Sequence, residues 1–343
     1  MKRKSTSLWL TIVLLLLGTH AHAVDPIPDE PGFSGFIRLG GGVLNYSSNT
    51  VAGAPLMDIG NDTIFNLTDT PDSDTTGIGV FNLELGWTFA SQQTQLVLGS
   101  SVEDIARLDY SQQLAVKREL ADESRLQLGF LFTGIPTEVY EDPFLTGSPR
   151  SDTDRTSYGF RIAYDSFLDS NFEVRYSLRN IDIDDERSGQ SLDLTSQERS
   201  LLERDGYRHA FDINYRYKYD DNNTFVPAIS FIYSDRDGDA MTYWATDFQL
   251  TYIFQEDPIT AVVNGILGFA EYDETNPVFG RTDDETRYGI SGQLYYKQPF
   301  GLMPFGDEDF SLFCDLGYYF VDTNIDFYET EAFLATAGVV FRF

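Results

Sequence analysis

Alternation of apolar and polar residues, in segments of about ten residues, is the feature that most constrains this chain. One such segment alternates along its whole length and reads Phe81, Asn82, Leu83, Glu84, Leu85, Gly86, Trp87, Thr88 and Phe89. A strand of this kind has one apolar and one polar face, and about ten residues let a tilted strand cross a bilayer. The pattern therefore predicts membrane-spanning β-strands.

The same alternation recurs along the chain. We expect strands in the segments 35–46, 81–89, 94–102, 110–118, 126–132, 158–164, 172–178, 211–219, 224–233, 244–254, 259–269, 287–297, 310–320 and 336–343. These segments predict an all-β fold, a transmembrane antiparallel β-barrel of about 14 strands, with about 12 or 16 if a weak hairpin merges or splits. An even number of strands lets both termini of the chain lie on the periplasmic side.

The connections between these segments fall into two classes. Alternate connections are short, and they comprise 90–93, 120–124, 166–171, 220–223 and 255–258. The others include the long segments 47–75, 133–155, 182–206 and 272–285. This asymmetry is typical of outer-membrane barrels, so we expect short periplasmic turns and long acidic extracellular loops. Loop 47–75 is long enough to fold into the lumen, and loop 182–206 contains a short helix predicted from Thr195, with Glu198 completing a capping box.

Residues 1–23 have the pattern of a secretory signal peptide. Basic residues precede an apolar run over 8–17, and the motif Ala21-His22-Ala23 fits a cleavage site. We therefore expect a signal peptide at 1–23, a short periplasmic segment at 24–32 and the transmembrane barrel at 33–343. The chain has a single cysteine, so no disulfide within it is expected.

The final segment carries a polar residue, a glycine and two aromatic residues at fixed places, namely Thr336, Gly338, Phe341 and Phe343. This pattern resembles the closing strand of bacterial outer-membrane β-barrels, and the chain from 33 to 343 resembles a porin-like barrel. The resemblance implies a Gram-negative protein integral to the outer membrane, in contact with lipid and lipopolysaccharide. It also implies that Gly338, Phe341 and Phe343 form the assembly signal for the barrel-insertion machinery. The segment 27–36 resembles the start of a family of uncharacterised outer-membrane proteins from gammaproteobacteria, which implies a location but no activity.

The chain is strongly acidic, with 54 Asp and Glu, 24 Lys and Arg, and a net charge of −30. This charge argues against nucleic acid as a partner. The long loops hold many of the acids, and the candidate constriction-loop acids in 47–75 are Asp58, Asp62, Asp69, Asp72 and Asp74. We predict no dedicated metal site and no cofactor, apart from Ca²⁺ or Mg²⁺ held loosely by the extracellular loops and bridging them to lipopolysaccharide phosphates.

Charged residues also occupy the polar face of the predicted strands. These candidate pore-lining residues are Glu84, Arg161, Glu173, Arg175, Arg179, Asp212, Arg216, Lys218, Asp247, Arg287 and Asp315. One interpretation is a hydrated lumen with a transverse electric field. The other is that charges of both signs pair across strands and fill the barrel. The sequence leaves both interpretations open.

Catalysis has little support in the sequence. Two of the three histidines lie in the predicted signal peptide, which leaves His209. His209 shares its parity with Phe211 and Ile213, so it is expected on the lipid-facing side, away from any lumen chemistry. We therefore predict no catalytic residues and no enzymatic activity.

The pattern favours an outer-membrane channel for passive diffusion of small hydrophilic solutes or ions. The alternative is a non-channel barrel that acts at the cell surface as an adhesin, a phage receptor or a stabiliser of the lipopolysaccharide layer. For the channel, the loop acids predict weak cation selectivity at low salt. This selectivity should fade as salt rises, because exposed charges are screened within about 10 Å at 0.1 M salt.

Overall fold

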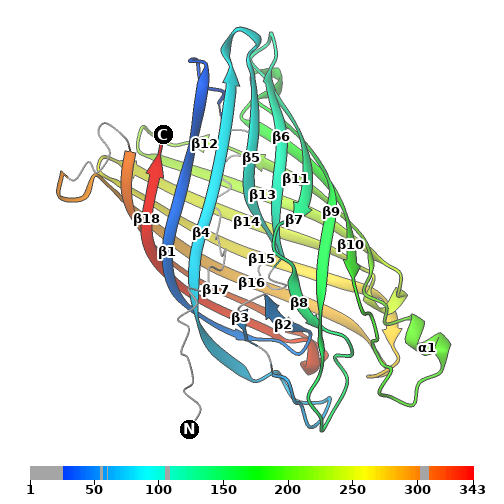
Figure 1. Cartoon of the computed structure of the whole chain (residues 1–343). Helices are drawn as coiled ribbons and strands as arrows, with labels where there is room; N and C mark the ends of the chain where they lie inside the picture. Colours follow the sequence, from blue (N-terminus) through cyan, green and yellow to red (C-terminus); the bar gives the residue numbers. More distant parts are fainter. Residues whose placement is uncertain (1–25, 55–56, 60, 105–108, 302–308) are drawn as a thin grey trace, which may run out of the picture.

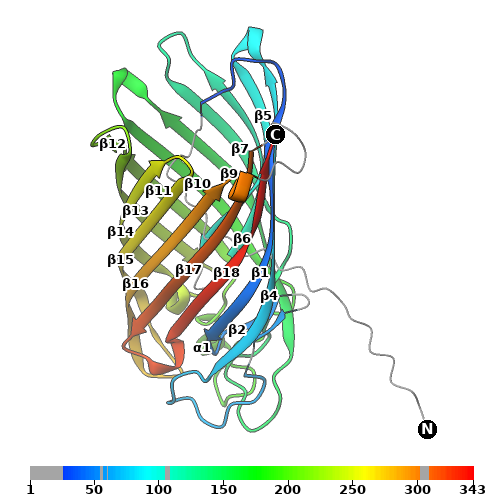
Figure 2. The ribbon, with the colours of Figure 1, turned by 90° about the vertical axis from the view of Figure 1, so that its left-hand side faces the viewer.

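A computed structural model describes residues 26–54, 57–59, 61–104, 109–301 and 309–343. Within these residues, 14 long strands form a closed antiparallel barrel, and they run obliquely around its wall (Figure 1, Figure 2). The strands are β1 (Gly32–Ser47), β4 (Ser73–Phe89), β5 (Thr94–Asp104), β6 (Asp109–Glu119), β7 (Arg125–Thr133), β9 (Asp152–Asp165), β10 (Phe172–Ile183), β11 (Gly206–Tyr215) with its continuation β12 (Tyr217–Lys218), β13 (Asn223–Arg236), β14 (Tyr243–Glu256), β15 (Ile259–Asn276), β16 (Arg281–Lys297), β17 (Asp309–Thr323) and β18 (Thr330–Arg342). The predicted fold class is confirmed, and each predicted segment coincides with one of these strands.

Shorter elements lie in the connections. β2 (Val51–Ala54), β3 (Met57–Asp58) and β8 (Thr137–Tyr140) belong to loops, and the 3-10 helices are η1 (Ala90–Gln92), η2 (Phe167–Asp169), η3 (Asp239–Met241), η4 (Pro299–Gly301) and η5 (Asp326–Tyr328). The α-helix α1 (Ser196–Ser200) begins after Thr195 with the predicted capping box to Glu198. In the part of the chain that the structure covers, no helix is long and apolar enough to cross a membrane. We call the end of the barrel that carries α1 and the long loops the outer end (Figure 1).

Many strands extend beyond their predicted bounds, and two differences change a predicted connection or strand. The segment 272–285 is not a long loop, because β15 and β16 continue to Asn276 and Arg281 and leave a short connection. These strand ends extend past the apolar band, where both faces are polar, so hydrophobic alternation no longer marks them. The predicted strand 211–219 is divided at Arg216 into β11 and β12, which pair with β13 in the same register, and the backbone N–H of Arg216 donates to the carbonyl of Asn171 at 2.9 Å.

Successive side chains along each strand point alternately to the outer and the inner face of the barrel wall. On β7, Leu128 and Phe130 point outward and are half exposed, whereas the neighbouring Gln127 and Leu131 are buried inside. Similar outward residues occur on the other strands, and they include Leu114, Phe160, Phe211, Phe248, Leu250, Ile290 and Leu316. A continuous apolar outer band around a partly polar interior is the distribution that a lipid-embedded barrel requires.

The first and last strands close the barrel at a tightly packed seam. β1 pairs with β18, and Gly40 lies opposite Gly338 in this register. The absence of a side chain at both positions leaves room for the Phe313 ring of β17, since an added Cβ at either glycine would collide with it. The Arg38 guanidinium stacks 3.7 Å from the centre of the same ring and pairs with the buried Asp315. Gly338 therefore has a packing role at the seam, whereas its role as an assembly signal stays a prediction.

Candidate functional site

Part of loop 47–75 enters the barrel. Val51 of β2 pairs with Val139 of β8, so two loop segments add a small sheet inside the outer end. Met57 and Ile59 are buried in a cluster with wall residues that include Leu44 and Leu334. Apolar side chains thus anchor this loop against the inner faces of β1 and β18, as its length and composition allowed.

The acidic part of the same loop does not line this interior. Asp62, Asp69, Asp72 and Asp74 are exposed to solvent. Asp74 accepts a hydrogen bond from the backbone N–H of Thr75 at 2.7 Å, which is a local turn contact. Asp58 lies on β3, but its side chain is outside the described part of the structure. The predicted constriction acids are therefore exposed where they are described, and apolar residues fill the inner position.

Loops from opposite sides of the barrel meet across the outer mouth. Phe144 follows β8, and Phe279 and Phe327 come from the β15–β16 and β17–β18 connections, about half-way around the ring of strands. Their ring centroids are 5.3 Å apart for Phe144 and Phe327, and 6.1 Å apart for Phe144 and Phe279. Leu202 and Ile325 are buried in the same cluster. We call these five residues the loop dome.

Polar contacts fasten the loops beside the loop dome. Arg150 donates to the carbonyl of Asn49 at 2.8 Å and to that of Pro143 at 3.0 Å. Its guanidinium also lies 3.6 Å from the centre of the Tyr140 ring. Asn49 in turn donates to the carbonyl of Phe327 at 3.1 Å. Burial lowers the pKa of Arg150 from its ordinary value. The carbonyls and the aromatic ring replace the water that this buried cation has lost.

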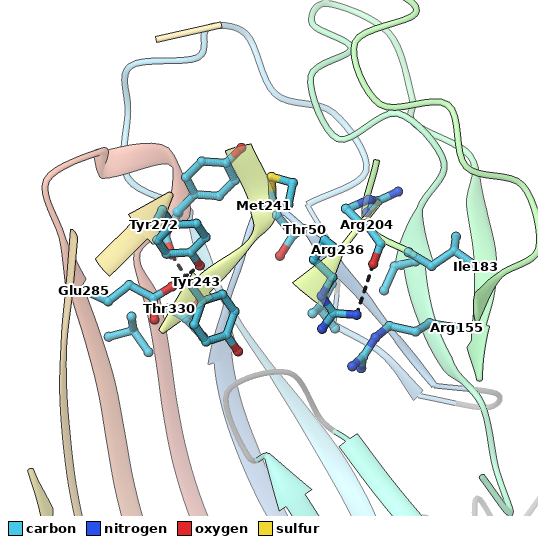
Figure 3. A pocket seen from close by; sticks show the side chains of 14 residues that line it. Thr50, Arg155, Ile183, Arg204, Arg236, Met241, Tyr243, Tyr272, Glu285 and Thr330 are labelled. Carbon is cyan, nitrogen blue, oxygen red and sulfur yellow. Dashed lines mark hydrogen bonds between the residues drawn. The ribbon is translucent and has the colours of Figure 1, made fainter. Parts of the chain in front are cut away.

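A cavity of about 110 Å³ lies in the lumen beneath these loops, and we call it the outer cavity. Inward residues of several strands line it, together with Val51 and Val139 from the loop strands. Figure 3 shows two unlike walls. Arginines occupy one wall, and tyrosines with a glutamate occupy the other: Arg155, Arg204 and Arg236 face Tyr243, Tyr272 and Glu285.

Hydrogen bonds hold both walls of the outer cavity in place. Arg204 donates through Nε to Glu186 at 2.7 Å and through Nη2 to the carbonyl of Tyr140 at 2.7 Å. Arg236 donates to the carbonyl of Arg204 at 3.2 Å. On the other wall, the Tyr272 hydroxyl donates to Glu285 at 2.6 Å (Figure 3).

Most of the predicted pore-lining residues lie on the inner wall in polar pairs. The nearest contacts of each pair are Arg175 to Asp212 at 2.8 Å, Asn214 to Glu173 at 2.7 Å, Arg287 to Asp247 at 3.4 Å, Arg161 to Gln113 at 2.9 Å and Arg179 to Ser111 at 3.1 Å. Asp315 forms an ion pair with Arg38. Glu84 and Arg216 also interact with neighbouring groups. Along the wall away from the outer cavity, this arrangement favours cross-strand pairing over a field of unpaired charges.

Lys218 differs from its prediction. It is exposed at the rim opposite the outer end and pairs with Asp221 at 3.0 Å, so it does not line the interior. Lys218 belongs to β12, a two-residue segment next to the turn, where both residues are exposed. His209 lies on the outer face as its parity indicated, where the Tyr176 hydroxyl is 2.8 Å from its Nδ1.

Sequence reasoning missed the arginines of the outer cavity. Arg155 and Arg236 lie at strand ends beyond the hydrophobic alternation, and Arg204 lies in a loop. The inward parity that Arg155 shares with Arg161 was an available signal. No comparable local pattern marks Arg204, since its partners Glu186 and Tyr140 come from other segments.

The fold and the site together define an outer-membrane type of β-barrel with an inward loop and a small charged cavity near its outer mouth. The chain belongs to the family described as "Protein of unknown function (DUF2860)", which it matches over residues 32–342. Among curated proteins, none matches it.

Several solved barrel structures are similar to this chain at low identity. The CymD monoaromatic hydrocarbon channel is 8% identical, with 92% of this chain and 89% of that chain covered and a TM-score of 0.46. The outer membrane channel DcaP of Acinetobacter baumannii is 10% identical, with 92% and 97% covered and a TM-score of 0.43. A Pseudomonas aeruginosa FadL homologue is 10% identical, with 91% and 89% covered and a TM-score of 0.41. Because these identities and TM-scores are low, the function has to be inferred from this chain's own residues.

Proposed function

We propose that the protein is an integral outer-membrane channel for passive diffusion of small hydrophilic solutes, and that the loop dome is its outer gate. The outer cavity is the observation that carries this proposal, because it is solute-sized space inside the lumen with charged groups on opposite walls. A barrel of 14 strands is also wider than the eight-stranded barrels whose interiors side chains can fill. Lipid would contact the apolar outer band, and lipopolysaccharide would surround the exposed acidic loops.

The same observations define how such a channel would open. The loop dome joins connections from opposite walls through aromatic contacts, whereas the barrel wall is joined by backbone ladders. Loop contacts are weaker than a closed ladder of strands and open at lower cost. Solutes would pass when the loop dome separates while the barrel stays intact.

Planar-bilayer recording of the purified full-length protein tests this function. We expect stable conductance steps from the wild type and longer open times from Phe327→Ala, which removes a fully buried ring from the loop dome. Phe65→Ala is the matched control, because Phe65 is 83% exposed in the first loop and its removal should change little. Electrical silence of folded wild type and folded Phe327→Ala would refute the channel.

A surface-interaction barrel is the second candidate. It is favoured by the paired charges along the inner wall, such as Arg175 with Asp212 and Arg287 with Asp247, which occupy space that a wide pore would leave open. This function predicts an electrically silent protein whose exposed loop acids affect adhesion or outer-membrane integrity in cells.

A further inference from the structure

We propose that the outer cavity binds a small organic anion, with its carboxylate at the arginine wall and a compact apolar or aromatic body against the tyrosine wall. The inference rests on the proposed channel function, because the site lies in the lumen that solutes would cross. It adds a class of solute that the fold alone does not specify.

The charge of the cavity lining favours an anion. The whole chain has a net charge of −30, yet the lining of the outer cavity contains three arginines and one acid, Glu285. Glu285 already accepts the Tyr272 hydroxyl and lies 3.9 Å from Arg287 on its own strand. Arg204 is paired with Glu186, which does not line the cavity, yet three guanidinium groups at one cavity still run against the composition of such an acidic chain. Guanidinium is also the side-chain group that best matches the planar geometry of a carboxylate.

The arginine wall is also held in a fixed position. Arg204 is held by the Glu186 carboxylate and the Tyr140 carbonyl, and its own carbonyl accepts from Arg236. Arg155 approaches the same space from β9, so three separate elements converge on it (Figure 3). Groups held in place before binding lose little conformational entropy when a ligand arrives.

The opposite wall of the outer cavity is aromatic and apolar. The rings of Tyr243 and Tyr272 lie 5.0 Å apart between centroids, and Met241, Val51 and Val321 add apolar surface. The volume of about 110 Å³ is smaller than the roughly 150 Å³ of an engineered cavity that holds benzene. The ligand body is therefore a short chain or at most one ring.

Calorimetry with purified full-length protein in detergent tests the site without requiring conductance. The probes are benzoate, its neutral isostere benzamide and the cation benzylammonium. We expect benzoate to bind at least about tenfold more tightly than either of the others, because hydrogen bonds to charged groups are stronger than neutral ones. Since the loop dome limits entry, each titration is repeated with Phe327→Ala.

Two substitutions distinguish anion binding at the outer cavity from a general effect of positive charge on the protein. Arg236→Gln should weaken benzoate binding about tenfold or more. Arg187→Gln is the matched control, because Arg187 is half exposed, pairs with Glu141 in the outer loops and does not line the outer cavity. Its effect should stay within about twofold, as is usual for a screened surface charge. If Arg236→Gln does not fold, Arg155→Gln takes its place.

The outcomes distinguish this inference from the channel proposal. Benzoate binding no tighter than benzamide binding in both backgrounds would overturn the anion site, and so would equal effects of Arg236→Gln and Arg187→Gln. A protein that binds benzoate but is electrically silent keeps the site and loses the channel. A protein that conducts but does not prefer benzoate keeps the channel and loses the site.

Discussion

Removal of the Phe327 ring should open the outer mouth while leaving the barrel folded. Phe327 is fully buried, and its centroid lies 5.3 Å from that of Phe144, 5.4 Å from that of Phe279 and 5.2 Å from that of Tyr328. Truncation of a fully buried Phe to Ala costs about 3–5 kcal/mol. All three partners lie in connections at the outer end of the barrel. The substitution should therefore destabilise the closed arrangement of the loops far more than it destabilises the barrel wall.

The magnitude can be converted into an opening equilibrium. A loss of about 3 kcal/mol corresponds to roughly a hundredfold change in the ratio of closed to open loops, since about 1.36 kcal/mol is tenfold. Single-channel recording should show this as a higher open probability. Limited proteolysis should show faster cleavage in the connection that contains Phe144.

Two results would refute this reasoning. If Phe327→Ala lowers the unfolding midpoint of the whole barrel without faster loop cleavage, the ring stabilises the wall and not a separate gate. If Phe65→Ala raises the open probability as much as Phe327→Ala does, burial in the loop dome is not the cause.

Three further predictions concern the seam, pH and selectivity. Arg38→Met leaves the buried Asp315 carboxylate without its cation and should lower the free energy of unfolding by about 3–5 kcal/mol in urea titrations in lipid, whereas Arg38→Met with Asp315→Leu should recover most of this loss. On the outer extension of β16, beyond the apolar band, burial raises the pKa of Asp283 to about 7. Its folded pKa exceeds its unfolded value of about 3.9, so its contribution to stability is greatest below about pH 4 and is lost as pH rises to about 7. The protection factors of amides near this residue, which are corrected for base-catalysed intrinsic exchange, should therefore fall from pH 5 to pH 8, and Asp283→Asn should flatten that fall. Reversal potentials at low salt should indicate anion preference, opposite to the expectation from the loop acids, and Arg236→Gln should reduce it; cation preference in the wild type would show that the exposed acids dominate.

The fold was predictable because lipid imposes a local rule on each strand. Every second residue meets hydrocarbon, so residues such as Leu128 and Phe130 mark a strand without knowledge of its neighbours. The rule failed where lipid is absent, as in the outer extensions of β15 and β16. It also failed at Lys218, which is exposed at the rim next to the turn.

The candidate site could be predicted only in part. Parity placed Arg175, Asp212 and Arg287 on the inner face, but it could not reveal which partner each one meets across the strands. The partner of each residue depends on the register between neighbouring strands, and this register is set only when the whole barrel closes. Arg204 and Arg236 lay outside the periodic segments and gave no signal of their own.

The barrel, its approximate strand number and the asymmetry of its connections are all predictable from the amino-acid sequence, because each follows from contacts between a short segment and its surroundings. Only the folded barrel shows which loop enters the lumen, how the loop dome covers the mouth and where the outer cavity forms. Phe144 meets Phe327, and Arg150 meets Asn49, across long separations in the chain. Such contacts have no period along the sequence, and they exist only once closure of the barrel brings opposite loops within reach of each other.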